Sequence, residues 1–359
     1  MMPTNKKLGA MADQSFKGFL LWALVHGAVG AAEGEPGVVH YPGESHLENV
    51  RQLTFGGQNA EAYFSFDGSE LIFQSTRGDR ECDAIFRMDA DGGNQRQVSS
   101  GEGATTCAFI APDGGAIVYA STHLGGAACP PKPDMSQGYV WSLYESYDIF
   151  RADPEGGNLV RLTDTPGYDA EAVYSPQGDR IVFTSVRDGD LDLYLMNPDG
   201  SGVERLTSAP GYDGGAFFSR DGEWVVWRAS RPSGERLAEY RRLLAQGLVR
   251  PGQLEIYIMN LKDRAPIQLT DNGAANFGPY WHPDGRHVIF SSNLADPKGR
   301  DFDLYLIDVE TREIERVTRF PGFDGFPMFS HDGKRLVFAS NRNNRVRGET
   351  NVFIADWRW

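Results

Sequence analysis

Residues 172–208 read AVYSPQGDRIVFTSVRDGDLDLYLMNPDGSGVERLTS, and variants of this stretch recur along the whole chain. The stretch contains a short apolar strand, a Ser-Pro-Gln-Gly turn, a second apolar strand, a polar loop, an Asp-Leu-Tyr strand, a Gly turn and an Arg-Leu-Thr strand. Short apolar runs separated by turn residues are typical of β-strands joined by hairpins. The unit therefore predicts four consecutive β-strands.

Six copies of this unit follow one another. The first turn of each copy contains a glycine, and these glycines lie 46, 64, 44, 63 and 48 residues apart, at Gly68, Gly114, Gly178, Gly222, Gly285 and Gly333. A period of about 45 residues with four strands per repeat is typical of β-propeller blades.

The sixth copy stops after its third strand, at residues 354–357. Its missing outer strand is supplied by residues 50–54, VRQLT, which match the Arg-Leu-Thr strand of the other copies. A propeller avoids bare sheet edges by closing into a ring. We therefore predict an all-β, six-bladed propeller of four-stranded blades over residues 49–359, closed by the N-terminal strand.

The turn at 175–178 and the sequence SVRDGDLDLY at 185–194 resemble the repeat of TolB-like propellers and of propellers attached to prolyl-oligopeptidase-type hydrolases. The likeness extends over residues 46–359 and implies the fold, whereas propellers of this kind serve many functions. TolB-like proteins also carry an N-terminal α/β domain. Only the short stretch 33–48 lies between the predicted signal peptide and the first strand, so we expect that domain to be missing. A role in the Tol envelope complex therefore does not follow directly.

The first 32 residues have the pattern of a secretory signal peptide. Lysines precede the apolar stretch 19–25, and small residues follow up to Ala32. This order is typical of a cleaved signal, although an uncleaved anchor is the alternative. We expect a signal peptide at 1–32, an N-terminal extension at 33–48, a periplasmic or secreted protein without stable membrane insertion after cleavage, and a monomer.

Charge and cysteine content limit the partners. The formal net charge is −14 and the sequence has no basic run, so nucleic acid, which needs clustered cations, is excluded as a partner.

The three cysteines are Cys82, Cys107 and Cys129. In an exported chain they allow one disulfide and one spare thiol, in any of three pairings.

Two long insertions mark one face of the predicted propeller. They are residues 123–145 in blade two and 231–252 in blade four, and both fall in loops between the second and third strands, on the face that we call the top. The spacing of Leu237, Tyr240, Leu244 and Leu248 predicts a helix in the second insertion, which either packs on the rim or acts as a lid. In the first insertion Tyr139, Trp141, Tyr144 and Tyr147 either stack on a ligand or anchor the loop.

Polar residues align at the starts of the inner strands. One column contains Asn59, Thr105, Asp169, Asp213, Asn276 and Asp324, and the positions two residues later include Glu61, Cys107 and Glu171. Side chains at i and i+2 of a strand share a face, so we expect these side chains to gather at the channel mouth. Repulsion among the five carboxylates would favour a hard cation, and a Ca²⁺ site is predicted at Asn59, Glu61, Asp169, Glu171, Asp213 and Asp324. The alternative is that Asp and Asn serve the turns before these strands.

Catalytic motifs are weak. Glu61 and Glu171 are candidates for acid–base chemistry, and His123 at the start of the first insertion is a candidate acid, base or ligand, or a structural histidine. The arginines that follow the second strands are expected to pair with carboxylates of neighbouring blades. Candidate ligand-binding residues are Tyr168, Tyr212, Arg77, Arg187, Tyr139 and Trp141.

We expect a propeller that binds a protein, peptide or glycan on its top face. The sequence does not decide whether it also catalyses a reaction. The alternatives are an extracellular carbohydrate lyase or hydrolase that uses channel carboxylates, and a scaffold of the cell envelope.

Overall fold

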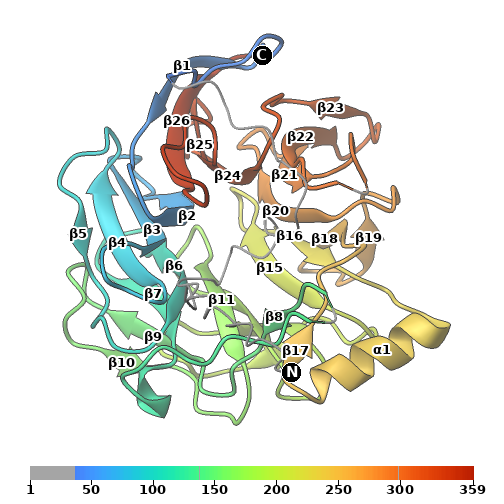
Figure 1. Ribbon diagram of the computed structural model, residues 1–359. Helices are drawn as coiled ribbons and strands as arrows, with labels where there is room; N and C mark the ends of the chain where they lie inside the picture. Colours follow the sequence, from blue (N-terminus) through green and yellow to red (C-terminus); the bar gives the residue numbers. More distant parts are fainter. Residues whose placement is uncertain (1–36, 137, 298) are drawn as a thin grey trace, which may run out of the picture.

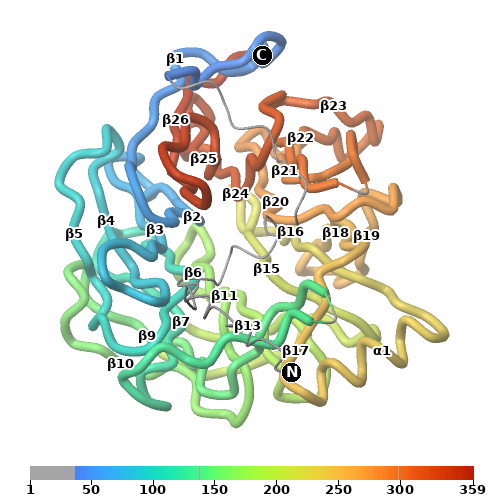
Figure 2. The backbone as a smooth tube through the Cα atoms, viewed as in Figure 1, coloured from blue at the N-terminus to red at the C-terminus, as the bar shows by residue number. Residues whose placement is uncertain are grey.

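Six antiparallel sheets of four strands are arranged as blades around a central axis in the computed structural model (Figure 1). The structure describes residues 37–136, 138–297 and 299–359, so the predicted signal peptide lies outside the described residues. In five of the sheets the strands follow one another outward in chain order, and in the sixth the order from the axis is β24, β25, β26 and then β1, as the backbone trace shows (Figure 2). The prediction of an all-β, six-bladed propeller is confirmed.

The strand bounds are as follows. Blades one to three contain β2 (Gln58–Phe64), β3 (Glu70–Thr76), β4 (Ala84–Asp89) and β5 (Arg96–Gln97); β6 (Thr105–Ile110), β7 (Ile117–Ser121), β9 (Asp148–Ala152) and β10 (Val160–Arg161); β11 (Asp169–Tyr174), β12 (Ile181–Ser185), β13 (Asp192–Met196) and β14 (Glu204–Arg205). Blades four to six contain β15 (Asp213–Phe218), β16 (Trp224–Ala229), β18 (Glu255–Asn260) and β19 (Pro266–Gln268); β20 (Asn276–Trp281), β21 (His287–Ser292), β22 (Asp303–Asp308) and β23 (Ile314–Arg316); β24 (Asp324–Phe329), β25 (Arg335–Ser340), β26 (Asn351–Trp357) and β1 (Leu47–Gln52).

The first turn of each unit is stabilised by its own side chains. In blade one Ser65 Oγ donates to Asp67 Oδ1 at 2.6 Å, and the backbone N–H of Ser69 donates to the same oxygen at 3.0 Å. Gly68 between them has φ of +71°, in the left-handed region that only glycine enters without cost. The repeated Ser-x-Asp-Gly pattern is therefore explained by turn geometry.

The Asp-Leu-Tyr and Arg-Leu-Thr strands are tied together by a second repeated contact. In blade three Arg205 Nη2 lies 2.5 Å from Asp192 Oδ2, and Thr207 Oγ1 donates to Asp192 Oδ1 at 3.1 Å while accepting from the backbone N–H of Leu193 at 2.9 Å. The pairs Asp148–Arg161 and Asp303–Arg316 repeat the ion pair. A buried carboxylate needs such a partner, so this motif is also structural.

The ring is closed by β1, which pairs antiparallel with β26 from Leu47↔Trp357 to Gln52↔Phe353. The predicted closure by the N-terminal strand is thus confirmed, with the strand at Leu47–Gln52. Ahead of it the extension places Glu44 against Arg342, at 3.1 Å, and Arg342 also holds Asp324 at 2.6 Å; the side chains of all three are fully buried. The N-terminal segment therefore closes the ring both by the pairing of β1 with β26 and by the buried ion pair of Glu44 with Arg342.

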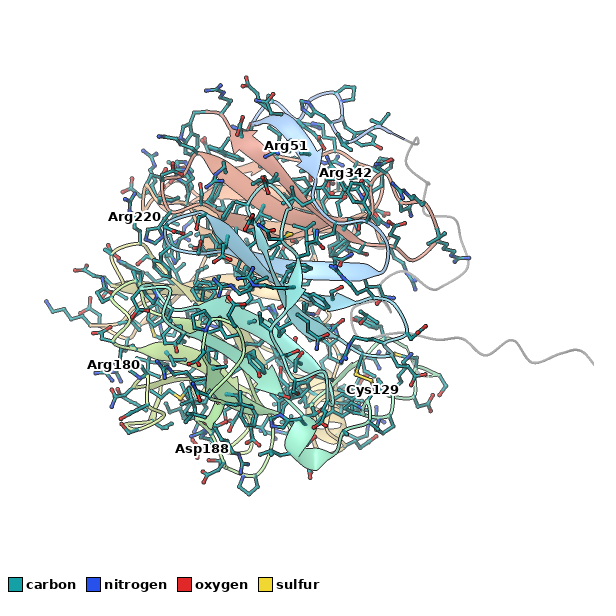
Figure 3. All side chains as sticks on the ribbon, turned by 90° about the vertical axis from the view of Figure 1, so that its left-hand side faces the viewer. Arg51, Cys129, Arg180, Asp188, Arg220 and Arg342 are labelled. Carbon is teal, nitrogen blue, oxygen red and sulfur yellow. A yellow bond between two sulfur atoms is a disulfide. The ribbon has the colours of Figure 1, made fainter. Side chains whose placement is uncertain are left out.

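Both insertions lie on one face of the ring, and they meet there. The helix α1 (Gly234–Leu244) and the short helix η2 (His123–Gly125) belong to these insertions, and β8 (Trp141–Ser142) of the first pairs with β17 (Leu248–Val249) of the second. In a side view Cys129 of the first insertion lies on the opposite face from Arg180 and Arg220 of the short turns (Figure 3).

The helix predicted in the second insertion is shorter than expected. It ends at Leu244, and Gly247 with φ of +67° reverses the chain, so Leu248 lies in β17 rather than on the helix. Tyr240 is buried in a cluster with Leu143 and Tyr212, and Leu237 and Leu244 pack against that cluster. The apolar stripe therefore packs down on the propeller.

Candidate functional site

The Asp and Asn residues that begin the inner strands do not line the channel. Nη2 of Arg187 lies 3.1 Å and 3.2 Å from the two carboxylate oxygens of Asp169. The same contact recurs within three other blades, as Asn59–Arg77 (2.7 Å), Asp213–Arg231 (2.7 Å) and Asp324–Arg342 (2.6 Å). The structure thus corrects two expectations: these side chains do not gather at the channel mouth, and the arginines pair within their own blade.

A β-bulge explains why residues i and i+2 of the inner strands do not face the same side, although regular strand alternation predicts that they do. In every inner strand the register shifts after the residue that follows the aligned Asp, Asn or Thr, for example between Ala170 and Val173 of β11. The next residue has a left-handed backbone, and this holds for Glu61, Cys107, Glu171, Gly215, Gly278 and Phe326, with φ from 50° to 63°. A bulge breaks the two-residue alternation of a strand. Positions i and i+2 therefore face different surroundings.

The arginines after the second strands are structural. The Arg187 guanidinium lies over the rings of Phe183 and Tyr194, at 5.0 and 5.1 Å, and Arg77 lies over Phe73 and Phe86 in the same way. Neither arginine lines the pocket described below, so the structure does not place them where a ligand would be bound.

His123 occupies the position of these arginines in blade two. Its Nδ1 lies 2.8 Å from Ser121 Oγ, and its ring lies 4.5 Å from that of Phe150. Arg187 makes the equivalent contact with Ser185 at 2.9 Å. The inner column of blade two has Thr105, whose hydroxyl donates to the Asp83 carbonyl at 3.2 Å. His123 lies outside the pocket.

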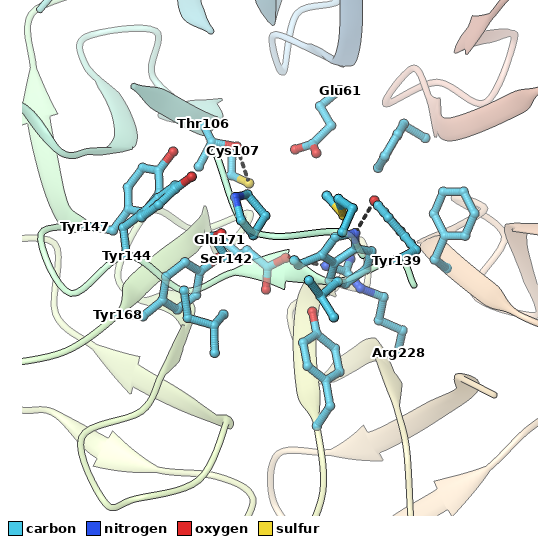
Figure 4. Close-up of a pocket in the computed structure, with 18 of the residues that line it drawn as sticks. Glu61, Thr106, Cys107, Tyr139, Ser142, Tyr144, Tyr147, Tyr168, Glu171 and Arg228 are labelled. Atoms are coloured by element: carbon cyan, nitrogen blue, oxygen red, sulfur yellow. Dashed lines mark hydrogen bonds and ion pairs between the residues drawn. The ribbon is translucent and has the colours of Figure 1, made fainter. Parts of the chain in front are cut away.

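Four of the bulge residues do meet at the channel mouth. Glu61, Cys107 and Glu171 come from β2, β6 and β11 and line one pocket, together with Arg228 of β16 (Figure 4). Phe326 of β24 lines the same pocket. Of the residues predicted to hold a cation, the structure therefore brings together the two glutamates and leaves the aspartates and Asn59 inside their blades.

Glu171 is fully engaged. Its Oε1 pairs with Arg228 Nη2, while its Oε2 accepts hydrogen bonds from Thr184 Oγ1 at 2.6 Å and from the Gly215 N–H at 2.8 Å. The Arg228 guanidinium also lies over the rings of Trp141 and Tyr212, at 5.3 and 5.5 Å. A charge-assisted pair with these extra donors holds both side chains in place.

Glu61 is the less satisfied carboxyl group. Burial raises its pKa to about 7, the Cys107 thiol lowers it by hydrogen bonding, and the charge of Glu171 raises it. Burial also raises the pKa of the Cys107 thiol well above its usual range, so this thiol is the neutral form at ordinary pH. A thiol is a weak donor, so among the described residues Glu61 has no strong hydrogen-bond partner, although the charge of Arg228 lowers its pKa.

The two insertions roof this space. Trp141 and Ser142 of β8 run over the mouth, and the indole N–H of Trp141 donates to Tyr139 Oη at 2.5 Å. A disulfide between Cys82 and Cys129 ties the first insertion to blade one and leaves Cys107 free, which resolves the three pairings left open by the sequence. The Tyr144 hydroxyl donates to the Pro131 carbonyl at 2.8 Å, so this ring anchors the loop as well as lining the space.

The pocket so formed contains about 1000 Å³ of space, part of it open to solvent. Nine aromatic side chains contribute to its lining: Tyr139, Trp141, Tyr144, Tyr147, Tyr168, Tyr212, Phe277, Phe323 and Phe326. The predicted ligand-binding residues Tyr139, Trp141, Tyr168 and Tyr212 are thus brought together. Sequence reasoning missed Arg228, although a charged residue inside the apolar strand WVVWRA was a usable signal.

The calcium site stays a prediction. Among the described residues no group of three or more His, Cys, Asp or Glu side chains is arranged to hold a metal ion. Binding at the predicted set would require Asp169, Asp213 and Asp324 to leave their arginine partners. Nor does any helix within the described part of the chain have the length and apolar character to cross a membrane.

The fold and site define a six-bladed propeller with a roofed aromatic pocket at one end of its channel, and comparisons with known proteins agree with the fold. The Tol-Pal system protein TolB of Francisella tularensis subsp. mediasiatica is 31% identical over 88 residues, which are 24% of this chain and 18% of that protein. The matched segment is thus a small part of that relative. No family model matches the chain.

Solved structures with the same fold cover more of the chain. A putative TolB from Agrobacterium tumefaciens superposes with a TM-score of 0.56 at 18% identity, covering 86% of this chain and 97% of that one. An oligogalacturonate lyase from Vibrio parahaemolyticus superposes with a TM-score of 0.51 at 15% identity, covering 90% and 98%. The chain therefore has TolB homologues and TolB-like structural neighbours, and at these identities the structural likeness shows the fold.

Proposed function

We propose that the protein is a binding propeller that takes a short segment of a protein partner into the roofed pocket at the channel mouth. The aromatic lining of that pocket is the observation that carries the proposal. Large aromatic side chains are the residues that dominate binding energy in recognition sites. The Tol-Pal system named for its relatives supports a protein as the partner.

The roof over the pocket favours a segment over a folded surface. The pairing of β8 with β17 would keep a folded domain from reaching the channel carboxylates. A peptide segment that passes under or beside the roof fits this arrangement.

An exported location supports this role. The predicted signal peptide and the Cys82–Cys129 disulfide both point to a periplasmic or secreted protein, because disulfides persist in oxidising compartments. In that setting the acidic chain would meet envelope or extracellular proteins. The scaffold hypothesis is a special case, in which the partner is an envelope protein held for assembly.

The proposal is tested by selecting peptides from a random displayed library on the folded protein and on its Trp141→Ala variant. We expect selected peptides to bind the variant at least tenfold more weakly, since Trp141 forms the roof over the pocket. Trp359→Ala is the matched control, because Trp359 is 67% exposed and packs on His282 and His287, away from the pocket. Peptides that bind the wild type and Trp141→Ala equally would contradict the proposal.

A second candidate function is a carbohydrate lyase or hydrolase acting in the same pocket. The specific observation is a carboxyl group with a pKa of about 7, Glu61, facing the ionised pair of Glu171 and Arg228. A carboxyl group of this pKa suits general acid–base catalysis near neutral pH. Turnover of acidic oligosaccharides that disappears in Glu61→Gln would favour this candidate over the binding role.

A further inference from the structure

We propose that the ligand segment inserts a basic side chain, lysine or arginine, into the aromatic pocket, with Glu61 as its counter-ion. This inference rests on the proposed function and names the chemistry that the pocket selects. It concerns an organic cation on a protein segment rather than a metal ion.

The charge balance of the pocket is the first argument. Its charged lining residues are Glu61, Glu171 and Arg228. Arg228 is engaged with Glu171, whose second oxygen is already filled by Thr184 and Gly215. The Arg228 charge also acts on Glu61, but among the described residues Glu61 forms no ion pair of its own, and the two glutamates share one arginine. A partly buried carboxylate in excess of the nearby positive charge is costly, so a ligand that supplies a cation is favoured.

The aromatic walls are the second argument. Faces of tyrosine, tryptophan and phenylalanine rings attract ammonium and guanidinium groups. The guanidinium of Arg228 already lies over Trp141 and Tyr212, so these walls accept a cation of this kind. Phe326 and Phe277 also line the pocket, with their rings 5.3 Å apart. A lysine or arginine side chain offers both the apolar stem and the charged end that such a lining matches.

The backbone at Glu61 is the third argument. Its φ of 50° is left-handed, at a bulge position that blades four and five fill with Gly215 and Gly278. A non-glycine residue in this conformation costs free energy that a glycine would avoid, and such residues cluster at binding sites. The strained position aims the carboxyl group of Glu61 into the pocket (Figure 4).

A metal ion fits this site less well than an organic cation. Calcium needs six to eight oxygen ligands, whereas the pocket offers the Glu61 carboxylate beside a thiol and aromatic rings. Glu171 would have to abandon Arg228 to contribute. The chemistry of the lining therefore selects a cation that needs one carboxylate and apolar surroundings.

Binding of a cation will depend on pH through Glu61. The groups that face it are Cys107 of β6, Glu171 of β11, Arg228 of β16, Tyr63 of its own strand and Asp83 before β4. Since only ionised Glu61 attracts the cation and its pKa is about 7, the dissociation constant should rise about tenfold from pH 8 to pH 6.

The test is an NMR titration of the full folded chain with three small probes: N-acetyl-arginine methylamide, the lysine equivalent, and the neutral citrulline equivalent. We expect the arginine and lysine probes to bind at least tenfold more tightly than citrulline, and Glu61→Gln to remove that preference. The matched control is Glu102→Gln, which removes the same charge from an exposed loop between blades one and two. Melting temperatures will show that each variant is folded.

Equal binding of citrulline and arginine, an unchanged preference in Glu61→Gln, or no binding of any probe to the wild type would overturn the inference. Its failure is distinguishable from that of the proposed function. Trp141-dependent peptides selected from the library without enrichment of lysine or arginine would keep the binding role and reject the cation. A library that yields no Trp141-dependent peptide would reject the binding role itself.

Discussion

At the scale of single residues, the left-handed positions of the inner strands show which side chains the fold does not require. All six inner strands have the same bulge, and glycine fills it in blades four and five. Glycine is the residue that this conformation suits best. The side chains of Glu61, Cys107, Glu171 and Phe326 are therefore not required by the bulge, and all four line the pocket.

Replacing Glu61 by glycine should stabilise the fold. We expect Glu61→Gly to raise the free energy of unfolding, measured with urea at pH 4.5, by about 1 kcal/mol, because the left-handed strain is removed. The gain should be larger at pH 8. A carboxyl pKa raised to about 7 means that the native state holds the proton more tightly than the unfolded state, so the wild type loses stability as pH rises from about 4.5 to 7.

The control for this prediction is Glu102→Gly. Glu102 is exposed and has no left-handed backbone, so the same substitution should lower stability slightly at both pH values. An unfolding free energy for Glu61→Gly at or below that of the wild type at pH 8 would contradict the assignment of Glu61 as a strained, partly buried acid.

The sequence alone located part of the site at this scale. Glu61 and Glu171 could be found because they occupy aligned positions where a turn role offers no explanation. The aspartates of the neighbouring column were misplaced, because regular strand alternation was assumed where each strand has a bulge. Arg228 was missed because its role depends on Glu171 of another blade, which no local pattern shows.

At the scale of elements, the two insertions act as one structure. The sequence placed both on the top face but gave no sign that they pair. β8 and β17 contribute two residues each, and their pairing joins blade two to blade four across the channel mouth. Such a short pairing is weak alone. Burial of Val249 of β17 together with Leu143 and Tyr240 supplies the stability.

The disulfide should control the order of this roof. In Cys82→Ser the first insertion loses its covalent tie to blade one, so we expect faster hydrogen exchange over residues 123–140 and a stability loss of about 2–4 kcal/mol. Hydrogen exchange detected by mass spectrometry will measure the first effect, and urea unfolding the second.

Cys107→Ser is the control, because Cys107 is unpaired and lies in β6 rather than in the insertion. It should leave exchange over residues 123–140 unchanged. If exchange in Cys82→Ser also stays at the wild-type rate, the roof is held by β8–β17 and by aromatic packing without need of the disulfide.

At the scale of the whole molecule, the ring depends on contacts between its two ends. β1 completes the sheet of the last blade, and Glu44 in front of it meets Arg342 and Asp324. Arg342 is fully buried and also lies over the rings of Phe338 and Tyr41, at 5.0 and 5.4 Å. Loss of this arginine would leave two carboxylates buried without their cation.

We therefore expect Arg342→Met to destabilise the protein by about 3–5 kcal/mol, as breaking a buried ion pair usually does. Arg358→Met is the matched control, since Arg358 pairs with Glu48 at an exposed site and should cost less than about 1 kcal/mol. Urea unfolding of both variants decides the point. Equal midpoints would show that the buried triad does not stabilise the closure.

The sequence by itself determined the propeller, its six blades, its closure and the face that carries the insertions. These follow from local chemistry, because turns, strand periodicity and the Asp–Arg–Thr contacts recur within each blade and leave a readable repeat. Only the tertiary structure decided which polar residues reach the channel, which cysteines pair, and how the insertions join. Those features depend on bulges that redirect side chains and on contacts between blades, such as Arg228 with Glu171, whose partners are far apart in the sequence.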